Sequence, residues 1–215
     1  MKKTLLIIVL IFITSSFISA QNCFTLGVEG GTKLQTGNLK DVWGPATGGS
    51  ILGTYNLSNL IGSSTEIQLV LKGGYYNAKE SDIFNDAYGA LVKTTVTVVW
   101  PVKLYPVTIG LKYFLCSCTE TKPYVTASIG TTLMKLNLVS VTSATGTVFN
   151  NGNDVVIGAF SYDFGAGVQF MISHSFYIDF NAEYDGIAKN IRVPTFTNTS
   201  QFQLIEINIG VGLRL

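Results

Sequence analysis

The chain has 215 residues, of which 47% are hydrophobic and only 13% charged, with a formal net charge of +1. The aromatic content and the shortage of charge exclude a disordered chain, and the 22 glycines argue against a coiled coil. A net charge so close to zero gives no electrostatic footprint for nucleic acid. The length suits a single domain.

The N-terminus has the pattern of a secretory signal peptide. Two lysines precede an apolar block over residues 5–13, and small residues follow up to Ala20. This block is shorter than the ~20 residues that a membrane-spanning helix needs. We therefore expect residues 1–20 to be cleaved and residues 21–215 to form one exported domain.

Apolar and polar residues alternate along most of the remaining chain. In chain order the alternation covers residues 24–33, 49–57, 65–76, 105–113, 125–133, 160–170, 176–184 and 205–215. The last segment is the clearest, because an apolar side chain stands at every second position from Ile205 to Leu215. A period of two indicates a strand with one apolar face. These segments predict about eight strands of about ten residues, the size of the smallest transmembrane barrels.

The two faces of these strands indicate what surrounds them. The apolar faces are nearly free of charge, whereas the polar faces mix glycine, serine, threonine and asparagine with a few charged residues. A soluble barrel would place its apolar faces inside, and a β-sandwich would have shorter strands of ~5–6 residues. We therefore predict an all-β fold, a single antiparallel transmembrane barrel whose apolar face meets lipid.

The links between the predicted strands alternate in length. Links 34–45, 77–100, 139–154 and 188–200 are long, and links 58–64, 116–122 and 173–175 are short. Outer-membrane barrels have long external loops and short periplasmic turns, with both termini inside the cell envelope. A chain that starts in the periplasm meets its long loop first, as this order predicts.

Charged residues on the polar faces would point into the lumen. They are Glu29, Lys33, Glu66, Lys72, Lys112, Asp163, Asp179, Glu183, Glu206 and Arg214. Charges inside a narrow barrel must pair or stay hydrated. Eight strands enclose a space only just wide enough for their own side chains, which favours a salt-bridged plug. The alternative is a narrow cation-preferring path, since acids outnumber bases six to four in this set.

Aromatic residues near the strand ends are candidates for the girdles of a membrane barrel. Tyr75, Tyr76, Tyr88 and Trp100 would lie on the external side, and Tyr55 and Tyr113 on the periplasmic side. Trp43 falls in the first long link, where it would cap the mouth.

Few residues offer catalysis or metal binding. The single histidine, His174, lies in the shortest predicted turn on the periplasmic side, whereas hydrolysis at the outer leaflet needs a base on the external side. Cys116, Cys118 and His174 match no structural zinc spacing. With Cys23 the cysteine count is odd, so one thiol would stay free or pair between chains. We therefore predict no catalytic residue, no metal and no cofactor.

Five stretches combine glycine with apolar residues in a distinctive way. They are FTLGVEGG at 24–31, VTIGLKYF at 107–114, KPYVTASIG at 122–130, FGAG at 164–167 and IGVGLRL at 209–215. These stretches resemble the small outer-membrane β-barrel family, of the outer-membrane protein A/X and PorT-like type. The resemblance implies insertion in the bacterial outer membrane and a last strand that the barrel-assembly machinery reads. Leu215 stands where that family usually ends in an aromatic residue.

The expected function follows from the predicted barrel. We expect a monomeric, non-enzymatic protein, surrounded by outer-membrane lipid, with a structural, envelope-integrity or surface-binding role through its external loops. The alternative is a small passive, porin-like channel with an acidic lumen. A third possibility is a lipid-modifying enzyme, which would need an external base that the sequence does not show. The sequence names no external ligand.

Overall fold

The computed structural model describes residues 24–36, 43–63, 65–80, 102–116, 120–137, 141–142, 148–149, 154–191 and 200–215. The predicted signal peptide at 1–20 and most of the predicted external loops lie outside these residues, as do Cys23, Tyr88, Trp100 and Cys118.

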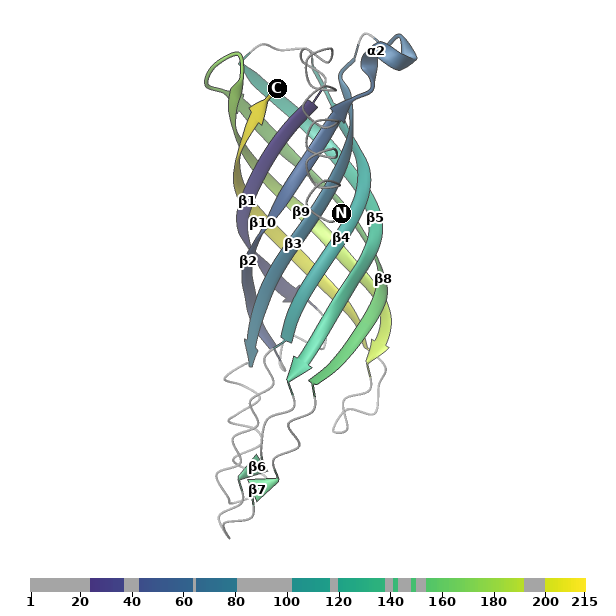
Figure 1. The fold of residues 1–215 in the computed structure, drawn as a ribbon, viewed down its shortest axis with the longest axis vertical. Coiled ribbons are helices and arrows are strands. Elements are labelled where there is room, and N and C mark those ends of the chain that lie inside the picture. Colours follow the sequence, from purple (N-terminus) through teal and green to yellow (C-terminus); the bar gives the residue numbers. More distant parts are fainter. Residues whose placement is uncertain are drawn as a thin grey trace, which may run out of the picture.

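Eight long strands form a closed barrel in which every neighbouring pair is antiparallel (Figure 1). The barrel strands are β1 (Phe24–Thr36), β2 (Trp43–Asn56), β3 (Ile67–Glu80), β4 (Val102–Phe114), β5 (Thr121–Asn137), β8 (Asp154–Met171), β9 (Phe176–Ile191) and β10 (Ser200–Arg214). The first and last strands pair from Thr25 opposite Arg214 to Thr36 opposite Gln203, which closes the barrel. The predicted eight-stranded antiparallel fold is confirmed.

The two ends of the barrel differ. Figure 1 shows the short helix α2 (Ser58–Ile61) and the C-terminus at one end, and the small strands β6 (Val141–Thr142) and β7 (Val148–Phe149) at the other. Helix α2 ends at Gly62, whose φ of 63° is the left-handed conformation that glycine adopts without strain. Among the described residues, no helix is both long and apolar enough to cross a bilayer.

The apolar faces of the strands point outward, away from the lumen. Ile51, Val107, Ile129, Phe160 and Ile209 are among the exposed outward-facing residues. The buried inward positions are instead mostly polar or charged over the middle of the barrel. This arrangement is the reverse of a soluble fold, and it buries the apolar surface against lipid.

At the end of the barrel opposite helix α2, which we call the external end because the long links lie there, the inward face becomes apolar. Leu104, Met134, Ile187 and Leu204 are buried there, while their neighbour Lys103 lies on the opposite face of β4. Polarity therefore reverses along the same strands. Because apolar residues no longer keep to the outward face at this end, the predicted strands are too short there. All eight observed strands extend at least three residues further toward this end than the pattern indicates.

Trp43 illustrates the same difference. We expected it in the first long link, but it is the first residue of β2 and is 2% exposed. The β2–β3 register shifts between Trp43 and Ala46, and such an irregularity lets an odd-numbered side chain join the inward face. The prediction of a loop over residues 34–45 is therefore wrong, and only residues 37–42 separate β1 from β2.

Glycines on the inward face make room for large tyrosines. A Cβ added at Gly167 would collide with the ring of Tyr124, and one at Gly212 would collide with the ring of Tyr177. The lumen is therefore filled by pairing an absent side chain on one strand with an aromatic ring on another.

We predict that Gly167→Ala destabilises the barrel by about 1–3 kcal/mol, because the added methyl group overpacks Tyr124. Unfolding in urea, followed by the difference in gel mobility between boiled and unboiled samples, measures the effect. Gly73→Ala is the matched control, since a Cβ at Gly73 meets no atom within 4 Å. Equal stability of the two variants would contradict this packing.

Candidate functional site

The centre of the lumen holds two lysines among carboxylates. Lys33 of β1 donates to Glu206 with an Nζ–Oε2 distance of 2.6 Å and also contacts Asp185. Lys72 of β3 lies 2.7 Å from Glu183 and 3.3 Å from the Oε2 atom of Glu206. Glu206 is fully buried. We call these five residues the central cluster.

The order of the strands explains why Lys72 matters. Strand β3 lies on the opposite side of the barrel from β9, with three strands between them in either direction. The ion pair from Lys72 to Glu183 therefore crosses the lumen rather than joining neighbouring strands. Its side chain is 8% exposed and so is that of Glu183, which leaves little water to weaken their attraction.

Like charges face each other directly on neighbouring strands in this cluster. Glu183 lies opposite Glu206 in the β9–β10 register, and Asp163 lies opposite Asp185 in the β8–β9 register. Such pairs are destabilising unless a cation comes between them. Lys72 contacts both glutamates of the first pair, which offsets their repulsion.

A second buried cluster surrounds Asp179, nearer the short-turn end. Its carboxylate accepts hydrogen bonds from Tyr124 Oη at 2.5 Å and from Gln169 Nε2 at 2.8 Å. Lys112 Nζ lies 3.2 Å from the same carboxylate and 4.0 Å from the ring centroid of Tyr124. Asp179 therefore combines an ion pair with two neutral donors.

Glu29 lies between the two clusters. It accepts hydrogen bonds from Asn181 Nδ2 at 3.0 Å and from Ser50 Oγ at 3.4 Å, and Lys72 lies 3.8 Å away. Asn208 in turn donates to Asn181 Oδ1 at 3.0 Å. Amides and a hydroxyl thus extend the network along the barrel axis.

Glu66 and Arg214 come together at the rim of the barrel, where both are half-buried. Glu66 lies 2.6 Å from Lys122 and 3.2 Å from Arg214. Burial by itself would raise the pKa of Glu66. The hydrogen bond and charge of Lys122, with the charge of Arg214, instead hold that pKa below its ordinary value of 4.5.

The structure thus distributes the sequence-predicted residues over three groups. Lys33, Lys72, Glu183 and Glu206 lie in the central cluster, with Glu29 and Asp163 nearby. Lys112 and Asp179 form the second cluster, and Glu66 and Arg214 lie at the rim.

Two members of the site were missed. Asp185 was missed because the predicted strand ended at Tyr184, whereas β9 continues to Ile191. The prediction that Tyr76 lies in the external aromatic girdle is wrong, because Tyr76 is fully buried and donates a hydrogen bond to Glu206. Its neighbour Tyr75 faces outward, 5.3 Å from the ring of Tyr105. Alternation with a period of two, continued along the strand from the inward-facing Lys72, would have placed Tyr76 on the inward face.

The carboxylates of the central cluster are poor candidates for metal ligands. Oxygens of Glu183, Asp185 and Glu206 lie within 4.8 Å of one another, but Lys33 and Lys72 already bind all three. His174 is exposed in the turn between β8 and β9, at the short-turn end of the barrel. Cys116 is disulfide-bonded.

Comparison with known proteins gives a consistent result. A family profile described as "Outer membrane protein beta-barrel domain" matches residues 5–214. The neisserial surface protein NspA is 14% identical, with a TM-score of 0.52 over 89% of this chain and 97% of that chain. A major outer membrane protein from Thermus thermophilus is 8% identical, with a TM-score of 0.57 over 89% of this chain and 99% of that chain. No curated protein matches the chain. At these identities the structures show a shared fold alone.

We predict that Lys72→Met lowers stability by about 3–5 kcal/mol, because it leaves Glu183 and Glu206 buried without their shared cation. Unfolding of the refolded barrel in detergent measures this loss. Lys103→Met, on the outward face of β4, is the matched control and should change stability little. A Lys72 variant as stable as the control would show that the pair across the lumen contributes nothing.

The rim group should make stability depend on pH in the acid range. Because the folded pKa of Glu66 is lowered, its ion pairs stabilise the barrel fully above the ordinary pKa of 4.5. This stabilisation is lost as the pH falls through the lower folded pKa. The free energy of unfolding of the wild type should exceed that of Glu66→Gln by at most about 1 kcal/mol at pH 7, since Glu66 is partly solvated. Paired unfolding curves at several pH values test this. A difference that grows toward pH 3 would have the wrong sign.

Proposed function

The chain belongs to the outer-membrane β-barrel protein family, and from this premise we propose that it is a closed barrel without enzymatic activity. In this proposal it supports the envelope and binds partners through its external loops. Family membership also confirms the resemblance inferred from the glycine-containing stretches, together with location in the outer membrane.

The layered filling of the lumen is the observation that carries the proposal. Apolar side chains, among them Leu104 and Leu204, fill the external end, and the central cluster lies beneath them. Lys72 then joins opposite sides of the barrel through Glu183 and Glu206. The cavity at this level measures about 20 Å³, which is room for about one water molecule. A solute would have to break buried ion pairs to pass.

The turn that carries the histidine supports a role without catalysis. Ser173 Oγ accepts hydrogen bonds from the backbone N–H groups of Ser175 and Phe176, so it stabilises the turn. His174 lies in the same turn, at the short-turn end of the barrel. Attack on lipid at the outer leaflet would need a base at the opposite end.

The external end of the barrel is suited to holding loops that bind partners. Strands β5 and β8 are the longest of the barrel and pair continuously from Thr121 opposite Phe170 to Asn137 opposite Asp154. Figure 1 shows β6 and β7 outside the barrel, beyond the ends of these strands. Strands placed beyond the barrel end lie away from the membrane surface, where partners are accessible.

Insertion and assembly complete the proposal. Strand β10 closes the barrel against β1, and Leu215 N donates to Phe24 O at 2.9 Å beyond the last ladder pair. We assign this strand as the one that the barrel-assembly machinery reads. The closed ladder leaves no strand edge for a second copy, which supports a monomer.

Planar-bilayer conductance of the refolded chain tests the closed lumen. We expect no stable conductance steps from samples whose gel mobility changes on boiling, with a large porin as the positive control. Repeated steps would contradict the proposal and favour the small cation-preferring channel. That alternative has its own support, since six buried carboxylates face three buried lysines in the described strands.

A further inference from the structure

Asp163 differs from the other carboxylates near the central cluster. It is 8% exposed and lies directly opposite Asp185 in the β8–β9 register. Asp185 contacts Lys33, whereas Asp163 has a hydrogen bond with Ser128 but no ion pair with any residue that the structure describes. A buried carboxylate beside a like charge needs a cation as well as a neutral donor.

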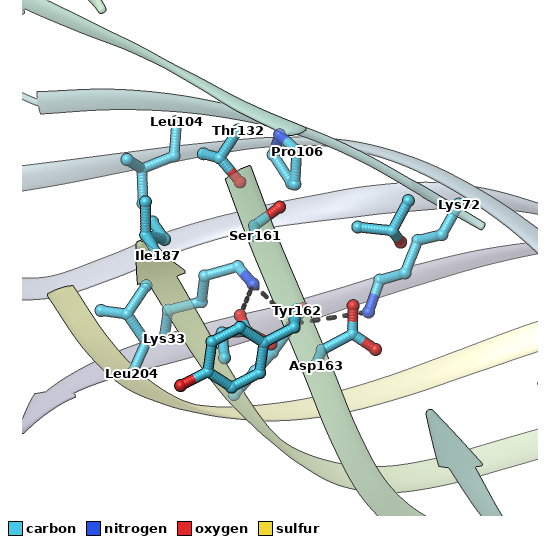
Figure 2. A pocket seen from close by; sticks show the side chains of 13 residues that line it. Lys33, Lys72, Leu104, Pro106, Thr132, Ser161, Tyr162, Asp163, Ile187 and Leu204 are labelled. Atoms are coloured by element: carbon cyan, nitrogen blue, oxygen red, sulfur yellow. Dashed lines mark hydrogen bonds and ion pairs between the residues drawn. The ribbon is translucent and has the colours of Figure 1, made fainter. Parts of the chain in front are cut away.

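A small cavity lies next to this carboxylate. It measures about 20 Å³, and Asp163, Ser161 and Thr108 are among the residues that line it (Figure 2). Ser161 and Thr108 are 5% and 6% exposed, and neither hydroxyl oxygen has a hydrogen-bond partner. Buried hydroxyls without a partner are rare, because each loses its hydration without replacement. Two such oxygens and one carboxylate without a counter-ion therefore line one space.

The charges around this cavity define what fits it. Three carboxylates line it, from Asp163, Asp185 and Glu206, and two ammonium groups, from Lys33 and Lys72. Lys72 also neutralises Glu183 outside the cavity, so at least one negative charge remains in excess. A divalent ion such as Ca²⁺ takes six to eight oxygen ligands, more than the Asp163 carboxylate and the two hydroxyls supply. A water molecule fits the space but leaves the charge unbalanced.

We propose that this cavity binds one small monovalent cation, of which Na⁺ is the representative, between the Asp163 carboxylate and the hydroxyl oxygens of Ser161 and Thr108. The site goes beyond the closed-barrel function, because it concerns the filling of the lumen rather than its external loops. Apolar side chains of Leu104, Ile187 and Leu204 also line the cavity, so they limit the access of bulk water to the ion.

Refolding in matched salts tests the proposal on the whole barrel. The chain is refolded and unfolded by heat in NaCl or in choline chloride at the same concentration, because choline is too large for the cavity. We expect Na⁺ at about five times its dissociation constant to raise the unfolding temperature by roughly 2–4 °C. Equal unfolding temperatures in the two salts would overturn the proposal and assign the space to water or the charge to a proton.

Single variants locate the effect. Ser161→Ala and Thr108→Val should each remove most of the difference between the two salts, and each is first checked for folding by gel mobility. Thr54→Val is the matched control, because Thr54 is also a buried hydroxyl without a partner but does not line this cavity. An Na⁺ effect that survives both cavity variants, or that Thr54→Val abolishes equally, would place the ion elsewhere and overturn the site.

Discussion

The interior of this barrel depends on ammonium groups placed among buried carboxylates. With lipid on the outside, the strands turn their polar residues inward, and directly opposed acids such as Glu183 and Glu206 result. These would repel each other in a space with little water. Lys72 reaches both acids from the other side of the barrel, and Lys33 reaches Glu206 from the neighbouring strand β1. The same contacts that neutralise charge therefore also tie the strands together.

Packing and electrostatics are coupled in this lumen. Tyr124 donates to Asp179 only because Gly167 leaves space for its ring, and Gly210 likewise leaves space for Glu29. The glycines of the polar faces are thus part of the charge network, although they carry no charge themselves. An eight-stranded barrel has no spare volume, so every large inward residue needs a small one near it.

The sequence predicted the fold, the location and the facing of the strands, because lipid imposes one apolar face over the whole membrane thickness. It did not predict the strand ends, where β9 extends to Asp185 and beyond, since polarity reverses outside the lipid. Nor did the sequence predict which side chains contact each other inside the lumen. Alternation decides which face a residue such as Tyr76 or Lys72 takes, whereas contact across the lumen depends on the stagger between strands far apart in the chain.

The most direct measurement is the proton exchange of the lysine ammonium groups, observed by nitrogen-detected NMR of the folded barrel in nanodiscs. Ammonium groups that are paired and shielded from water exchange slowly, and those in a hydrated pore exchange fast. The account predicts three slowly exchanging signals that are lost one by one in methionine variants of Lys33, Lys72 and Lys112. Fast exchange at all three positions would contradict a lumen closed by buried ion pairs.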